Sequence, residues 1–195
     1  MNANSISLAA GKDASNLQTL FAKMKNVYYN AGQITANMLT SAGVECELEF
    51  PVISDGVSFN TGEADVTETK LTTGATWTSR ADKGDSDISF QVASIAGELD
   101  DLFLTKRTSA SVTGIKVQGL EGTFGGDSYS LDVNKVTGSL VMTDDNRQTV
   151  LILTNVEMYG SLVVADGDNP AYFNVKVTPQ ANTDGAALLI LRKEA

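Results

Sequence analysis

EADVTETKLTTGATWTSRADKGDSDISFQVASIAGELDDLFLTKR, residues 63–107, divides into three parts with different chemistry. In the first part, Val66 to Thr78, the residues that favour strands are mostly threonines, and the apolar side chains are Val66, Leu71, Ala75 and Trp77. Neither face of such a strand can bury a core of its own. We therefore expect this segment to be extended, to project from the subunit and to meet another chain.

The other two parts each have an apolar face to bury. Apolar residues alternate with polar ones from Ile88 to Val92, which predicts a strand with one buried side. A helical spacing follows over about 95–106, with apolar residues at Ile95, Leu99, Leu102 and Phe103. Acidic residues early in this segment and Lys106 and Arg107 at its end complement a helix dipole.

Before this stretch, the sequence predicts an N-terminal helix and a strand. The helix is predicted over about 14–29, because apolar residues recur there at helical spacing: Leu17, Leu20, Phe21, Met24, Val27 and Tyr28. Such a helix either faces the core or lies as an arm on a neighbouring subunit. From Val44 to Phe50 apolar residues alternate with Glu45, Glu47 and Glu49, and we interpret the glutamates as the solvated face of a strand rather than as acid catalysts.

After this stretch, the pattern is almost entirely β. Short alternating strands are separated by turns at 144–147, 166–170 and 182–185, and residues 119–127 are a glycine-rich connection. The fold predicted is mainly β: an antiparallel β-sandwich or barrel with a flanking short helix (about 95–106), a long protruding hairpin or loop (about 64–86) and the N-terminal helix. We expect one domain over 1–195, with an arm and helix in 1–43 and the β core in 44–195.

The composition excludes many kinds of site. Histidine is absent, so no Ser-His-Asp or Cys-His nucleophile and no His-ligated metal can form. Asp82, Asp85 and Asp87 lie close in sequence but lack the frame of a calcium loop, and Cys46 is the one cysteine. We expect no catalytic residue, no cofactor and no metal, and hence no enzyme. The chain has 14 basic and 24 acidic residues, a net charge of −10, and no basic cluster that would grip DNA.

The pattern of these segments resembles that of bacteriophage major tail tube proteins. Residues 87–104 (DISFQVASIAGELDDLFL) look like that family's strand followed by a short helix, and residues 57–80 look like its long extended segment and loop. Residues 135–142, 149–164 and 167–177 are similar to its C-terminal strands, so the resemblance spans roughly residues 57–191. The N-terminal helix is a departure, because a short arm is commoner there.

The resemblance implies a structural virion protein that forms rings, usually hexameric, which stack into a hollow tail tube. Its partners would be copies of itself and other tail proteins, and genomic DNA would pass through the lumen without specific binding. The matching loop would reach the adjacent ring, with Leu71 and Trp77 as contacts and with Arg80, Asp82, Lys83 and Asp85 as charges at the rim.

Two other interpretations remain. One is the tube protein of a contractile injection system, which shares this architecture. The other is a monomeric or trimeric β-sandwich binding module, of the capsid decoration or adhesin type. The N-terminus lacks the pattern of a signal peptide and no stretch is long enough to span a membrane, so we expect a soluble product made in the cytoplasm. The resemblance implies assembly in the host cytoplasm and a place in the virion tail.

Overall fold

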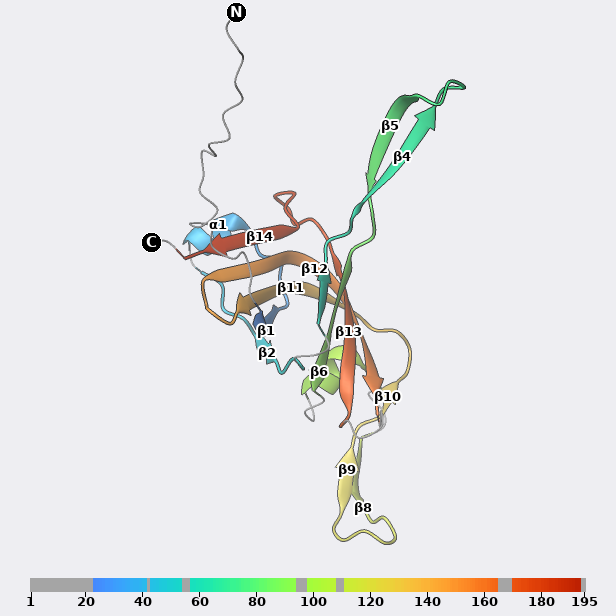
Figure 1. The fold of residues 1–195 in the computed structure, drawn as a ribbon. Helices are drawn as coiled ribbons and strands as arrows, with labels where there is room; N and C mark the ends of the chain where they lie inside the picture. The colour runs from blue at the N-terminus through green and yellow to red at the C-terminus, as the bar shows by residue number, and fades with distance from the viewer. Residues whose placement is uncertain are drawn as a thin grey trace, which may run out of the picture.

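The computed structural model describes residues 23–41, 43–53, 57–93, 98–107, 111–164 and 170–193 (Figure 1). These residues are mainly β with antiparallel strands, as predicted, and they include two short helices. The largest sheet has the strand order β2-β1-β11-β12-β13-β6-β3, and β14 pairs with β12 as well. Its strands are β1 (Met24–Asn30), β2 (Leu48–Phe50), β3 (Ser58–Asn60), β6 (Asp87–Ala93), β11 (Lys135–Asp144), β12 (Thr149–Val163), β13 (Tyr172–Pro179) and β14 (Leu188–Arg192).

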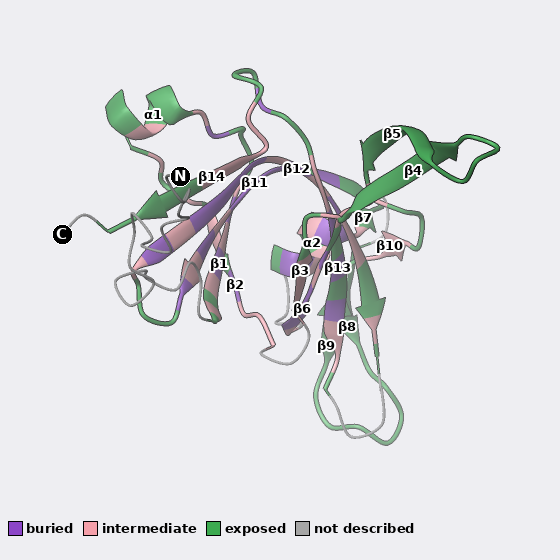
Figure 2. Cartoon of the chain, turned by 45° about the horizontal axis from the view of Figure 1, so that its top comes forward, coloured by how far each residue is buried: buried purple, intermediate pink, exposed green. Residues whose placement is uncertain are grey.

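The long strands β11 and β12 are the centre of this sheet. One edge of β12 pairs with β11, and its other edge pairs first with β14 and then with β13. The register shifts between Gly138 and Leu140, where a bulge bends the pair. Ser139 and Thr154 are fully buried at this point and donate hydrogen bonds to the backbone carbonyls of Gly32 and Ala186. The bend turns the two halves of the sheet toward each other (Figure 2).

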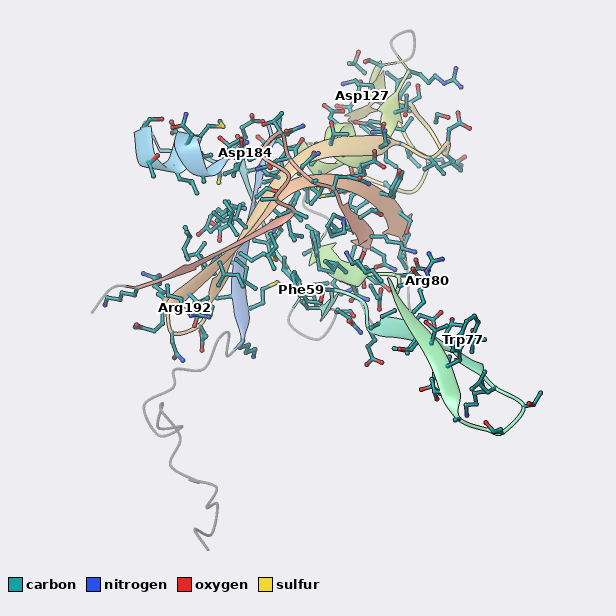
Figure 3. The ribbon with its side chains drawn as sticks, turned by 90° about the horizontal axis from the view of Figure 1, so that it is seen from above. Phe59, Trp77, Arg80, Asp127, Asp184 and Arg192 are labelled. Atoms are coloured by element: carbon teal, nitrogen blue, oxygen red, sulfur yellow. The ribbon has the colours of Figure 1, made fainter. Side chains whose placement is uncertain are left out.

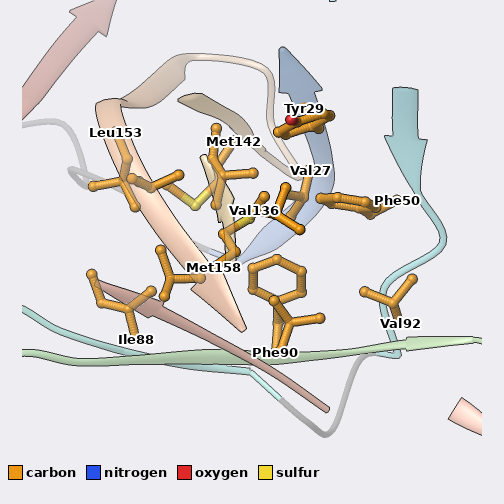
Figure 4. Close-up of a cluster of buried hydrophobic side chains, with 14 of the residues drawn as sticks. Val27, Tyr29, Phe50, Ile88, Phe90, Val92, Val136, Met142, Leu153 and Met158 are labelled. Carbon is orange, nitrogen blue, oxygen red and sulfur yellow. The ribbon is translucent and has the colours of Figure 1, made fainter. Parts of the chain in front are cut away.

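The core fills the space between the two halves (Figure 4). The rings of Phe50, at the end of β2, and Phe90, on β6, have centroids 5.8 Å apart although they come from opposite halves. Val52 forms a bridge with Val92 next to this pair. Within the described residues the strand order does not return to its first strand, so the sheet curls without closing.

Helix α2 (Glu98–Phe103) packs against β11 and β12 with Leu99 and Phe103 buried. The ring of Phe103 lies 5.9 Å from that of Phe50 and 5.3 Å from that of Phe173. The helix is shorter than predicted, because β7 (Thr105–Lys106) begins two residues after it. Lys106 is therefore outside the helix, and residues 95–97 of the prediction lie outside the described residues.

The predicted N-terminal helix is wrong over Met24–Asn30, which is β1. Val27 and Tyr29 are buried with period two, and Tyr29 donates a hydrogen bond to the Thr137 carbonyl at 2.9 Å. The helical spacing arose because Met24, Val27 and Tyr28 also fit a period of 3.6, whereas aromatic and β-branched residues favour a strand. Residues 14–22 of the predicted helix lie outside the described residues.

A helix that the sequence analysis did not predict, α1 (Ala36–Ser41), has no buried residue. Thr35 caps its first turn, since its hydroxyl accepts a hydrogen bond from the Met38 amide at 3.3 Å. Gly43 ends it with a φ of 75° and donates its amide hydrogen to the Met38 carbonyl at 3.0 Å. In the sequence, Thr35 and Gly43 were the residues that could have indicated the start and the end of this helix.

Several local predictions are confirmed. The strand at 88–92 is β6, and the turn at 144–147 joins β11 to β12. Asp144 is buried there because its carboxylate accepts hydrogen bonds from the amides of Gln148, at 2.8 Å, and Thr149, at 3.2 Å. Residues 149–164, which were expected to be strand, contain one continuous strand, β12. Residues 166–169 of the turn predicted at 166–170 lie outside the described residues.

Candidate assembly interface

The Thr-rich segment forms a two-stranded hairpin, β4 (Ala64–Lys70) and β5 (Thr76–Lys83), as predicted. Every residue from Ala64 to Lys83 is exposed, and the hairpin extends away from the body (Figures 1 and 2). Its two strands pair with each other and with no other described strand. The hairpin thus adds nothing to the core of its own subunit.

Two glycines build the base of this hairpin. A Cβ at Gly62 would lie 2.4 Å from the Gly84 carbonyl oxygen, and a Cβ at Gly84 would lie 2.4 Å from the Glu63 carbonyl oxygen. Gly62 also has a φ of 91°. Only glycine allows the two backbones to approach this closely, and the Gly84 amide donates to the Glu63 carbonyl at 2.8 Å. The sequence analysis missed both residues, although isolated glycines beside strands are a signal of close backbone approach.

One face of the hairpin carries Val66, Ala81 and Trp77, with the charged Glu68 beside them. Val66 pairs directly with Ala81, so their side chains share a face. Alternation along β5 places Trp77 on this face as well. Trp77 is the extra residue where the register shifts between Thr69 and Lys70, and it is 70% exposed (Figure 3). A bulge commonly redirects a side chain, and here it presents an indole to solvent.

The other face carries Asp65, Arg80 and Asp82. Asp65 lies directly opposite Asp82, and the repulsion between two like charges in this position destabilises the strand pair. Arg80 is next to this pair, and its guanidinium contacts the Asp82 carboxylate at 2.9 Å. Exposed ion pairs contribute little stability, so we interpret Arg80 mainly as the charge that offsets the two aspartates.

The six predicted contact residues all lie on the hairpin or at its ends. Leu71 begins the tip, where its amide donates to the Ala75 carbonyl at 2.8 Å, and it is 48% exposed. Lys83 ends β5, and Asp85 follows Gly84 at the base. Trp77 and Leu71 are therefore available to a partner, Arg80 and Asp82 contact each other, and Lys83 and Asp85 are close to the body.

A second projecting hairpin consists of β8 (Val112–Ile115) and β9 (Phe124–Gly126), and β9 lies within the glycine-rich connection predicted at 119–127. All its residues are exposed. The sequence analysis missed it as a surface, although apolar residues recur among its glycines. Its large exposed apolar side chains are Val112, Ile115, Val117, Leu120 and Phe124.

A polar network fixes the base of this second hairpin. Lys106 contacts Asp127 at 2.6 Å, and Ser111 hydrogen bonds the same carboxylate. These two contacts hold the pKa of Asp127 below its usual value. Tyr129, on β10 (Tyr129–Ser130), donates to Asp101 of α2 at 2.7 Å, which raises the pKa of the phenol to about 12.

The remaining surface offers a groove but no metal cluster. An open groove of about 610 Å³ is lined by residues of β12 and β13, and Leu104, Leu131 and Leu162 are among its lining residues. No group of three or more Cys, Asp or Glu residues in the described ranges is placed to hold a metal ion. None of the described helices is long and apolar enough to span a membrane.

No protein-family model and no curated protein matches this chain. The assignment of a function therefore depends on the surfaces described above and on the sequence pattern.

Proposed function

We propose that this protein is a structural subunit that assembles with its own copies into stacked rings around a conduit, in the manner of a bacteriophage major tail tube protein. The observation that carries the proposal is the β4–β5 hairpin. It buries nothing in its own subunit, and it presents Trp77 to solvent. At its base, Gly62 and Gly84 let the two backbones pack closely. A projecting, unpaired hairpin is an aggregation liability unless another chain covers it.

The body of the subunit supports the same proposal. Tail tube subunits are expected to have a sandwich or barrel body, and the bend in β11 and β12 brings the two halves of this sheet face to face. The Val52–Val92 bridge joins the chain after β2 to β6, near the other end of the strand order. We therefore include a barrel-like body in the proposal.

The proposed partners are copies of this chain, in rings that are usually hexameric, together with other tail proteins. In this proposal the protein resides in the virion tail, and DNA passes through the lumen. A net charge of −10 suits such a conduit, because like charge suppresses sticking between the wall and the DNA.

Self-assembly of the purified full-length chain tests this proposal. We expect rings or tubes in negative-stain electron microscopy, and light scattering that increases with protein concentration. A chain that stays strictly monomeric at high concentration would contradict the proposal. A monomer or trimer with a ligand in the groove next to Leu131 would instead favour the binding module.

The conduit also predicts a lack of DNA affinity. The chain neutralises few phosphates because its 14 basic residues are dispersed among 24 acidic ones. We expect no binding tighter than about 100 µM to duplex DNA at physiological salt, measured by fluorescence anisotropy. Sub-micromolar affinity would contradict the lumen role while leaving self-assembly intact.

A further inference from the structure

The β8–β9 hairpin has the composition of a contact surface. Leu120 is 60% exposed and Phe124 is 43% exposed, and the hairpin carries three more exposed aliphatic residues. Clusters of exposed apolar side chains on one projecting element are typical of interaction sites. Near its base, Leu131 and Val133 are 93% and 82% exposed, which extends the apolar surface toward the body.

This hairpin is also almost free of charge. Residues 111–126 include one basic residue, Lys116, and one acidic residue, Glu121, so their net charge is zero in a chain of net charge −10. Depletion of charge is the compositional signal of an interface core. The β8–β9 hairpin can therefore approach another acidic copy of the chain without the repulsion that most of the surface would cause.

The base of the hairpin restricts its orientation. The base is the paired strands β7 and β10 and the residues beside them. There Arg107 donates its amide hydrogen to the Ser128 carbonyl at 2.8 Å, and the Lys106 ammonium contacts the Asp127 carboxylate. The Tyr129–Asp101 hydrogen bond then ties this base to α2, whose Phe103 is in the core. A surface held in advance loses less entropy on binding than a free loop does.

In Figure 1 the two projecting hairpins leave the body at opposite ends, β4–β5 at the top and β8–β9 at the bottom. Each has exposed apolar residues, and the two sets lie at different places on the molecule. Contact between different surfaces of identical chains is heterologous, and it propagates into a stack when it does not close on itself. If subunits stack along this direction, the β8–β9 end of one copy faces the β4–β5 end of the next.

We propose that the β8–β9 hairpin is the second half of the stacking contact, and that its occupant is the face of the β4–β5 hairpin of another copy that carries Val66 and Trp77. Leu120 and Phe124 would meet Trp77 and Val66 of that copy, excluding water from both apolar sets. This inference rests on the proposed self-assembly and adds the surface that receives the projecting hairpin.

Substitution of two apolar residues tests the proposed contact. In the full-length chain, Leu120→Ser with Phe124→Ser should raise the concentration needed for half-maximal assembly at least about tenfold, measured by sedimentation. Circular dichroism should be unchanged because both residues are exposed. Met38→Ser is the matched control, since Met38 is 41% exposed on α1, and it should assemble like the wild type.

A photo-crosslinking amino acid at position 120 identifies the occupant. We expect crosslinks to residues 64–83 of a second copy, located by mass spectrometry. If the wild type forms tubes but the double variant assembles equally well, or if crosslinks map elsewhere, this inference is wrong and the proposed function stands. If the wild type never assembles, both are wrong.

Discussion

Removal of the β4–β5 hairpin should abolish assembly and leave the subunit folded. The structure gives a clean way to make this change: Ala64–Lys83 is replaced by Asn-Gly, which joins Glu63 to Gly84. The Gly84 amide already donates to the Glu63 carbonyl at 2.8 Å, so a two-residue turn closes the gap between paired backbones. All replaced residues are exposed, and we expect the free energy of unfolding to change by about 0.5 kcal/mol or less.

The loss should be measurable in two ways. Circular dichroism and thermal unfolding should match those of the intact chain, whereas sedimentation and electron microscopy should show no rings or tubes. A shortened chain that unfolds would mean that the hairpin supports its own subunit. A shortened chain that still stacks would remove the hairpin from the interface.

A single substitution provides a milder version of the same test. Trp77→Ala should weaken stacking by about 2 kcal/mol, roughly 30-fold in assembly concentration, as expected for an aromatic hot spot. Thr78→Ala is the matched control, because Thr78 is the next residue on β5 and pairs with Thr69 on the other face. Equal effects of the two substitutions would show that the indole is not the contact.

The sequence predicted those elements whose structure is determined by the residues of the element itself. The alternation of Ile88, Phe90 and Val92 identified β6, because one face of that strand is buried throughout. The projecting hairpin was also predictable, since a strand of threonines with scattered apolar residues has no face to bury. The local pattern does not determine what covers Trp77, because the proposed partner surface lies on another copy of the chain.

Other elements depend on contacts between distant parts of the chain. Met24 to Tyr28 satisfied a helical period, but β11 supplies the strand partner that makes Met24–Asn30 extended. Pairing across a sheet overrides such a local pattern. The bend of β12 and the exposed apolar surface of β8–β9 were likewise hidden, since each depends on how distant parts of the chain are arranged.

The contact between Gly160 and Phe103 should control how α2 attaches to this sheet. Gly160 lies on β12, and a Cβ there would lie 2.5 Å from the Phe103 ring and 2.8 Å from the Phe103 Cβ. The ring cannot move freely, because it packs between Phe50 and Phe173. Gly160→Ala should therefore destabilise the subunit by about 1–3 kcal/mol through overpacking, and Phe103→Ala should cost about 3–5 kcal/mol through the cavity that it leaves.

The double variant distinguishes this steric explanation from a general intolerance of substitution at Gly160. Phe103→Ala removes the two ring contacts at 2.5 Å and keeps the Cβ contact at 2.8 Å. The cost of Gly160→Ala should therefore decrease by about 1 kcal/mol relative to the single variant without vanishing. Urea unfolding of the four proteins in the cycle measures this coupling. Gly138→Ala is the matched control, because its new Cβ would meet the Asn30 backbone carbonyl at 2.4 Å, which truncation of Phe103 does not relieve. Additive costs at Gly160 would mean that the backbone of β12, and not the aromatic ring, requires glycine there.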